Sequence, residues 1–214
     1  MLQDFYVPLI MNNGIMIPMG ESIVVVSGLP RSGTSLAMQM LASAGLPVYT
    51  DQKRQPDFHN PRGYFEHAQV LTLPVDQSWV PQVKGHAVKV IHALIPFLPS
   101  NEQYKVIFMT RNIEEVVASQ ARMLESMGRK GGLLSDSQLA LSLAQDLERT
   151  QLWMNLQDNI DWITIDYNLL IEQPLIEISK ILGLLYEHPD DLEGIPERMA
   201  SCVQGELYRN RAGL

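Results

Sequence analysis

The stretch from Ile23 to Leu36 constrains the fold of this chain more than any other. It opens with four consecutive apolar residues, as in a short buried strand, and continues into a loop that contains Gly28 and Gly33. Residues 34–44 then run without glycine or proline and place their apolar side chains on one helical face. A strand, a glycine loop and a helix in this order can cradle a phosphate, because the loop N–H groups and the helix N-terminus attract an anion.

The loop departs from the P-loop signature at one informative position. Gly28 and Gly33 have the spacing of its first half, and Ser35 fits its end, but Thr34 stands where the signature has lysine. The nearest cation is Arg31, inside the loop. A nucleoside triphosphatase needs that lysine on the β- and γ-phosphates and an acidic residue for Mg²⁺. The sequence therefore favours anion binding by arginine and backbone over Mg²⁺-assisted hydrolysis.

Strand-like and helix-like segments alternate along the chain. Strands are expected to start near residues 22, 47, 87, 105 and 161. Helices are expected at residues 34–44, from 113, from 135, at 174–185 and at 196–202, and the third begins with the capping-box pattern Ser135-x-x-Gln138. This alternation implies a parallel sheet. We predict a three-layer α/β P-loop fold with a central parallel sheet of about five strands and helices on both faces.

Residues 1–20 differ from the rest of the chain. Two apolar runs flank Asn12-Asn13-Gly14, and Asn-Gly between apolar runs is a strong hairpin signal. We predict a hairpin-like flap over residues 1–20, followed by one domain over residues 21–214. Either the flap packs on this domain, or its methionine-rich face contacts a substrate, a second copy of the chain or a partner protein.

The charge and composition of the chain exclude several classes of function. Over 214 residues, 16 Lys and Arg oppose 24 Asp and Glu, and the net charge of −8 argues against broad binding to nucleic acid or anionic membranes. The single cysteine, Cys202, excludes an intrachain disulfide and suits a reducing compartment, so we expect a cytoplasmic protein. No apolar run reaches the ~18 to 20 residues of a membrane span, and no signal peptide is recognisable.

A second candidate anion site follows the strand expected at 105–110. Arg111 comes directly after this strand, and ligands of open α/β sheets bind at the carboxyl ends of strands. Ser119 lies eight residues later, about two helical turns away. A guanidinium and a hydroxyl can together hold a phosphate, although spacing alone favours a surface arginine and a small helix residue without such a role.

Four segments together resemble the motifs of one family. Residues 28–36 are similar to the 5′-phosphosulfate loop of sulfotransferases, and Thr110-Arg111-Asn112 with Ser119 is similar to their 3′-phosphate motif. Residues 165–170 resemble the segment that closes the nucleotide site in that family. Residues 60–66 resemble a segment of small bacterial sulfotransferase-like proteins.

The resemblance implies that the donor is 3′-phosphoadenosine 5′-phosphosulfate (PAPS) and that no metal takes part. It assigns the 5′-phosphosulfate to Pro30, Arg31, Ser32, Gly33, Thr34 and Ser35. It assigns the 3′-phosphate to Arg111 and Ser119, and it makes Tyr167 a candidate for stacking near the adenine. Arg31 is then expected to stabilise the transferring sulfuryl group.

Sulfuryl transfer also needs a base for the proton of the acceptor. Glu66 ends a turn-rich segment, and Arg62 nearby is expected to keep it ionised. His92 follows a strand that contains Lys89, which resembles the Lys-x-His element of cytosolic sulfotransferases, but the two residues here are three apart rather than two. Side chains alternate between the two faces of a strand, so this spacing changes whether Lys89 and His92 face the same side. Both Glu66 and His92 stay candidates, and the sequence favours Glu66.

Two other functions stay open at this point. One is an atypical P-loop kinase, in which Asp166 at the end of a strand would hold Mg²⁺. The other is a nucleotide-binding module without catalysis, in which Glu66 and His92 would both be dispensable.

For a sulfotransferase, the acceptor is a hydroxyl or amine on a small molecule, a carbohydrate or a peptide. Three segments are expected to select it: residues 51–80, residues 128–138 and the flap.

Overall fold

The structure is a computed structural model, and it describes residues 21–58, 60–128, 132–189 and 192–205. The hairpin-like flap predicted for residues 1–20 lies outside this part of the chain, as does the C-terminal end of the predicted domain. Among the described residues, no helix is long and apolar enough to cross a membrane.

The described residues contain a five-stranded sheet in which all neighbouring strands are parallel, in the order β2-β3-β1-β4-β5. The strands are β1 (Ile23–Gly28), β2 (Val48–Tyr49), β3 (Ala87–Lys89), β4 (Tyr104–Thr110) and β5 (Ile160–Asp166). The prediction of a parallel α/β sheet is confirmed, and each strand begins within about a residue of its expected start.

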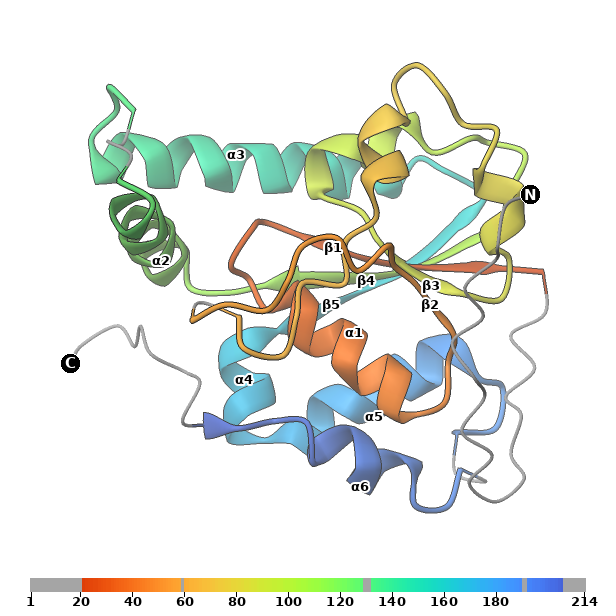
Figure 1. Ribbon diagram of the computed structural model, residues 1–214. Helices are drawn as coiled ribbons and strands as arrows, with labels where there is room; N and C mark the ends of the chain where they lie inside the picture. The colour runs from red at the N-terminus through yellow and green to blue at the C-terminus, as the bar shows by residue number, and fades with distance from the viewer. Residues whose placement is uncertain (1–20, 59, 129–131, 190–191, 206–214) are drawn as a thin grey trace.

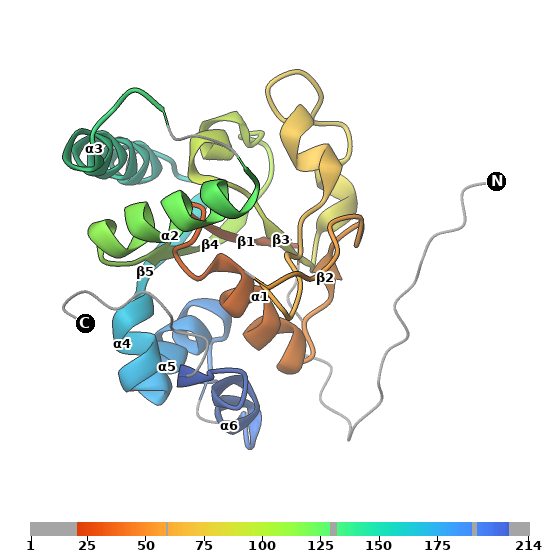
Figure 2. The ribbon, with the colours of Figure 1, turned by 60° about the vertical axis from the view of Figure 1, so that its left-hand side comes forward.

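Helices cover both faces of this sheet (Figures 1 and 2). One face carries α1 (Thr34–Ser43), α4 (Tyr167–Glu172), α5 (Pro174–Leu185) and α6 (Ile195–Ala200). The other carries α3 (Asp136–Met154) and the short 3-10 helices η1 (Ala68–Thr72), η2 (Val80–Val83) and η3 (His92–Phe97). Helix α2 (Ile113–Ser126) packs on α3. The three-layer arrangement is therefore confirmed.

Strand β1 contributes to both hydrophobic cores. Val24 and Val26 pack on the α1 face, while Ile23 and Val25 pack on the α3 face, and all four side chains are fully buried. A central strand of a parallel sheet is covered on both sides, which explains why residues 23–26 of this strand are all apolar.

Local sequence signals explain where the helices begin. Ser135 and Gln138 form the predicted capping box at the start of α3. Asn112 caps α2 through the backbone N–H groups of residues 114 and 115, and Asp166 caps α4 in the same way. Strand β3 stops at Lys89, so His92, which was expected directly after this strand, instead begins η3.

The order of the strands positions the site. Strand β1 lies between β3 and β4, and the segments that follow these three strands leave the sheet at the same edge, because the strands are parallel. This edge carries the phosphate-type loop after β1, Lys89 at the end of β3 and Arg111 after β4. Ligands of open α/β sheets bind at such a place.

Candidate functional site

The loop between β1 and α1 packs tightly against its neighbours at two positions. Gly28 and Gly33 have φ angles of 140° and 98°. A Cβ atom on Gly28 would lie 2.4 Å from the carbonyl oxygen of Met109, and one on Gly33 would lie 2.4 Å from Cδ2 of Tyr167. Both positions therefore require glycine, which lets the loop backbone lie directly against β4 and α4.

Arg31 is held at both its side chain and its backbone. Its φ angle of 78° is left-handed, which is uncommon for a residue other than glycine and is concentrated at functional sites. Its Nε donates a hydrogen bond of 3.0 Å to Ser119 Oγ, and its carbonyl oxygen accepts one of 3.2 Å from Arg111 Nη1. Burial, with the nearby charge of Arg111, lowers the pKa of the Arg31 guanidinium. A bound anion would stabilise the charged guanidinium and so offset both the burial and the repulsion from Arg111.

Arg111 is anchored by α2 and α4. Its Nε donates to Glu115 Oε2 over 2.9 Å, and the two side chains are only 7% and 3% exposed. Its guanidinium carbon lies 4.6 Å from the centre of the Tyr167 ring, within cation–π range. Asn168 Nδ2 also contacts both oxygens of Glu115, at 3.3 Å. Arg111 therefore has little freedom to move, and a carboxylate fixes its orientation.

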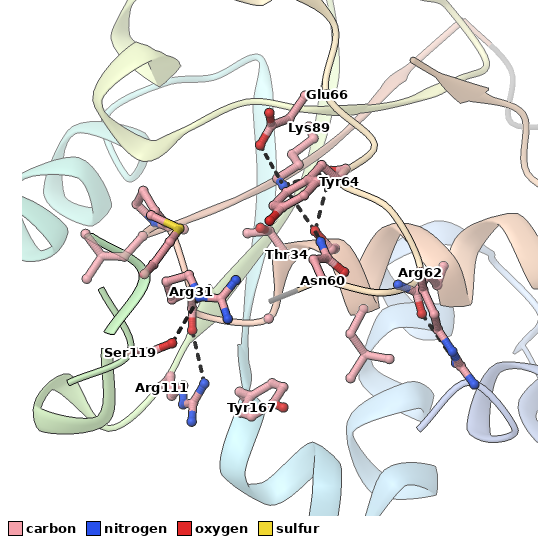
Figure 3. A pocket seen from close by; sticks show the side chains of 18 of the residues that line it. Arg31, Thr34, Asn60, Arg62, Tyr64, Glu66, Lys89, Arg111, Ser119 and Tyr167 are labelled. Carbon is pink, nitrogen blue, oxygen red and sulfur yellow. Dashed lines mark hydrogen bonds and ion pairs between the residues drawn. The ribbon is translucent and has the colours of Figure 1, made fainter. Parts of the chain in front are cut away.

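Lys89 lies between Ser35 and Glu66 (Figure 3). Its ammonium group donates to the Tyr64 carbonyl oxygen at 2.9 Å and to Ser35 Oγ at 3.2 Å, and it lies 3.4 Å from Glu66 Oε1. Its side chain is 10% exposed, and burial lowers the pKa of the ammonium. Asn60 Nδ2 bonds the same Ser35 hydroxyl at 2.9 Å. One buried cation thus joins the end of the phosphate-type loop to the candidate base.

Glu66 has two cationic partners, and they differ from the one that the sequence indicated. Arg54 Nη1 lies 3.2 Å from both of its carboxylate oxygens, and Lys89 contacts Oε1. Arg62 instead donates to the Cys202 carbonyl oxygen at 2.7 Å, so the expectation that it keeps Glu66 ionised is wrong. The Glu66 side chain is 42% exposed, which leaves it open to a substrate.

The turn-rich segment after β2 is held in place by aromatic contacts. The Tyr64 hydroxyl lies 2.7 and 2.8 Å from the two oxygens of Asp57. The guanidinium of Arg54 stacks 3.4 Å above the Tyr64 ring, and Phe65 between Tyr64 and Glu66 has a positive φ of 53°. These contacts turn the Tyr64 carbonyl and the Glu66 carboxylate toward Lys89.

Most of the predicted residues line a single cavity of about 460 Å³ at the carboxyl edge of the sheet. It contains Pro30, Arg31, Gly33, Thr34, Ser35, Glu66, Arg111, Ser119 and Tyr167. Among the residues that the structure describes, its lining has one carboxylate, that of Glu66, and the cationic residues Arg31, Arg54, Arg62, Lys89, Arg111 and Arg122. The cavity is therefore basic although the whole chain is acidic, and it is suited to an anionic ligand.

Two predicted residues do not line this cavity. Ser32 is 1% exposed, and its hydroxyl and its N–H both bond the Leu29 carbonyl oxygen, so it shapes the loop from inside. His92 begins η3 beside the cavity rather than in it, and burial lowers the pKa of its imidazole. Of the two candidate bases, the cavity holds Glu66.

Asp166, the candidate Mg²⁺ ligand of the kinase alternative, also lies outside the cavity lining. Asp166 Oδ1 accepts from the backbone N–H groups of Asn168 and Leu169, at 2.7 and 3.1 Å, and it does not line the cavity. In the described part of the chain, no three His, Cys, Asp or Glu side chains are gathered as metal ligands would be. A metal-independent reaction stays a prediction.

The sequence pattern did not single out Arg54, Asn60 and Tyr64 as site residues. The similarity of residues 60–66 to small sulfotransferase-like proteins pointed to the segment that contains Asn60 and Tyr64, and Arg54 lies in the segment 51–80 that was expected to select the acceptor. The sequence indicated Lys89 only as part of the pattern with His92. In the structure, Lys89 lines the cavity and His92 does not.

No family model matches this sequence, and no curated protein matches it in sequence. Many solved structures are similar to it, among them the following three. Sulfotransferase STF1 from Mycobacterium tuberculosis H37Rv has 15% identity and a TM-score of 0.50, over 85% of this chain and 77% of that one. The sulfotransferase domain from the curacin biosynthetic pathway has 14% identity and a TM-score of 0.47, over 87% and 79%. Retinol dehydratase in complex with androsterone and the inactive cofactor PAP has 12% identity and a TM-score of 0.49, over 92% and 67%. The likeness to STF1 is one of fold, and this chain has the fold of a sulfotransferase.

Proposed function

We propose that this protein is a sulfotransferase that moves a sulfuryl group from PAPS to a hydroxyl or amine acceptor without a metal. One observation carries the proposal. The ammonium of Lys89 contacts both Ser35 at the end of the phosphate-type loop and the carboxylate of Glu66. A cation and a carboxylate thus lie side by side where a phosphosulfate and an acceptor would meet.

The residues present fit a donor with negative charge at two separated places. The loop offers backbone N–H groups and Arg31 to the 5′-phosphosulfate, and its glycines leave no Cβ to fill the cradle. Arg111 and Ser119 lie together at the α2 side of the cavity, suited to the 3′-phosphate. Tyr167 packs beneath Arg111 and is 8% exposed, so we assign it first to holding Arg111.

PAPS, when bound, supplies a sulfuryl group and the leaving group 3′-phosphoadenosine 5′-phosphate. The chain's own residues do the rest. Glu66 accepts the proton of the acceptor hydroxyl or amine on a carboxylate oxygen. Lys89 and Arg31 place positive charge where the transferring group and the departing phosphate oxygen would gain negative charge, and burial of these two cations limits the screening of their charge by water.

The two other functions predict different behaviour. A kinase would need Asp166 to hold Mg²⁺ beside the nucleotide, but Asp166 does not line the cavity, and its Oδ1 caps two backbone N–H groups at the start of α4. A nucleotide-binding module without catalysis would have no use for the Lys89–Glu66 pair beside the loop. No contact among the described residues of the cavity favours the kinase or the non-catalytic module over a sulfotransferase.

Calorimetry with 3′-phosphoadenosine 5′-phosphate, in Mg²⁺ and in excess chelator, tests the proposal. We expect the same affinity in both conditions. Arg111→Ala should weaken binding by about tenfold or more, because it removes a charge-assisted contact to phosphate. Arg149→Ala is the control, since Arg149 is an exposed residue of α3 outside the cavity. Mg²⁺-dependent binding of ATP in place of this nucleotide would overturn the proposal in favour of the kinase.

A further inference from the structure

The cavity has more positive charge than the proposed donor uses. Arg31 and Arg111 flank Ser119, and Arg122 follows Ser119 by one turn of α2, so these three lie on the side assigned to the 3′-phosphate and the loop. Lys89 contacts the hydroxyl at the end of the loop. The side chains that remain are Arg54 and Arg62.

Of these two, Arg54 is the one that contacts the candidate base Glu66. Arg62 Nη1 already contacts the Cys202 carbonyl oxygen and the Gln39 side chain. Arg54 bonds Glu66 through Nη1 alone, and in the described part of the chain no acceptor bonds its Nε or Nη2. Its side chain is 40% exposed.

Arg54 is also fixed in orientation. Its guanidinium plane stacks 3.4 Å above the Tyr64 ring, and Tyr64 is 5% exposed and bonded to Asp57. A planar guanidinium that is already held in place loses little freedom when it binds an anion, and its fork matches two oxygens of one group. Arg54 therefore has the properties of a preorganised binding group rather than those of a solvated surface charge.

The position of Arg54 indicates what it binds. Figure 3 shows Glu66, Lys89 and Tyr64 at one end of the site and Arg111 and Tyr167 at the other. Arg54 contacts Glu66 and Tyr64, so it lies at the end where the acceptor would be deprotonated. Phe58 lines the same cavity and is 75% exposed, which offers an apolar contact to the body of an acceptor.

We propose that the acceptor carries an anionic oxygen group, a carboxylate or a sulfate, near the hydroxyl or amine that is sulfated, and that Arg54 binds this group. The inference rests on the proposed function and narrows its substrate class. Charge balance supports it. Glu66 becomes neutral when it takes the acceptor proton, which leaves Arg54 without its counter-charge unless the acceptor brings one.

Calorimetry on the protein saturated with 3′-phosphoadenosine 5′-phosphate tests this inference with matched pairs of compounds. The pairs are 4-hydroxybenzoate and its methyl ester, methyl glucuronide and methyl glucoside, and a tyrosine peptide flanked by glutamate or by glutamine. In at least one pair, we expect the anionic member to bind about tenfold more tightly, as for one charge-assisted hydrogen bond.

Arg54→Gln should reduce that preference to about twofold or less, and Arg54→Lys, which keeps the charge without the planar fork, should fall between. Arg149→Gln removes an equal charge outside the cavity and should leave the preference intact. Equal binding within all three pairs, or a preference that survives in Arg54→Gln, would overturn the inference. Undiminished affinity for the nucleotide shows that each variant is folded. Failure of the wild type to bind the nucleotide at all would instead overturn the proposed function.

Discussion

Arg111, just before α2, and Glu115, in its first turn, form an almost completely buried ion pair with an Nε–Oε2 distance of 2.9 Å. Glu115 has no place in the cavity lining, yet it determines how Arg111 faces the cavity. Its other contact, Asn168, ties the same pair to α4. The residue proposed to bind the 3′-phosphate is therefore oriented by a carboxylate that no ligand would touch.

Removing this carboxylate should reduce both stability and nucleotide affinity. Glu115→Ala leaves Arg111 buried without its counter-charge, and breaking a buried pair in this way costs about 3–5 kcal/mol of unfolding free energy. Denaturant unfolding measures the stability loss, and calorimetry with 3′-phosphoadenosine 5′-phosphate measures the affinity. Glu114→Ala is the matched control, since Glu114 is the exposed neighbour on α2. Equal effects of the two variants would contradict the positioning role.

Replacing the candidate base should separate turnover from binding. Glu66→Gln keeps the size of the side chain but cannot accept a proton, so we expect a loss of turnover of about 10²-fold or more. Nucleotide affinity, measured by calorimetry, should change little, because the loop and Arg111 stay in place. His92→Gln provides the comparison, and a larger loss of turnover in that variant would move the base to His92.

The burial of His92 should make stability sensitive to mild acid. Burial lowers the pKa of its imidazole in the folded state, so the unfolded chain takes up the proton first as the pH falls below about 6.5. Stability that is present above this pH is then lost progressively. Denaturant unfolding at pH 7.5 and pH 5.5 should show a smaller loss for His92→Gln than for the wild type. Parallel losses in both proteins would show that other groups govern the effect.

Two glycines should respond to alanine in opposite directions. Gly33→Ala places a Cβ 2.4 Å from the Tyr167 ring at a φ of 98°, and we expect a loss of about 1–3 kcal/mol together with weaker nucleotide binding. Gly183→Ala in α5 meets no atom within 4 Å and should gain up to about 1 kcal/mol from helix propensity. Thermal or denaturant unfolding of the two variants measures whether stability falls in Gly33→Ala and rises in Gly183→Ala.

Local sequence patterns were sufficient for the elements and for part of the site. The apolar run of β1, the capping box of α3 and the helix of α5 each depend on residues within one or two turns of each other, and such patterns are physical consequences of helix and strand periodicity. Arg111 and Ser119 were identified from a local motif as well, since they lie eight residues apart, just before α2 and within it, and both line the cavity.

The surroundings of Glu66 could not be found from such patterns. Lys89 reaches Ser35 from a position 54 residues away in the sequence, and Arg31 reaches Ser119 across 88 residues. Contacts of this kind depend on which strands are neighbours and where each strand stops. Because β3 ends at Lys89, that side chain enters the cavity, whereas His92 has already left the strand and begins η3.

The sequence by itself determined the strand, the glycine loop and the helix that begin at Ile23, because these depend on apolar periodicity and on backbone angles that only some residues adopt. It also determined that Thr34 stands where the P-loop signature has lysine and that the loop's cation is Arg31 instead. Only the tertiary structure decided that Lys89 from β3 supplies a cation beside that loop and that Arg54, rather than Arg62, accompanies Glu66. The packing of distant segments at one edge of the sheet sets these distances, and no local pattern contains that information.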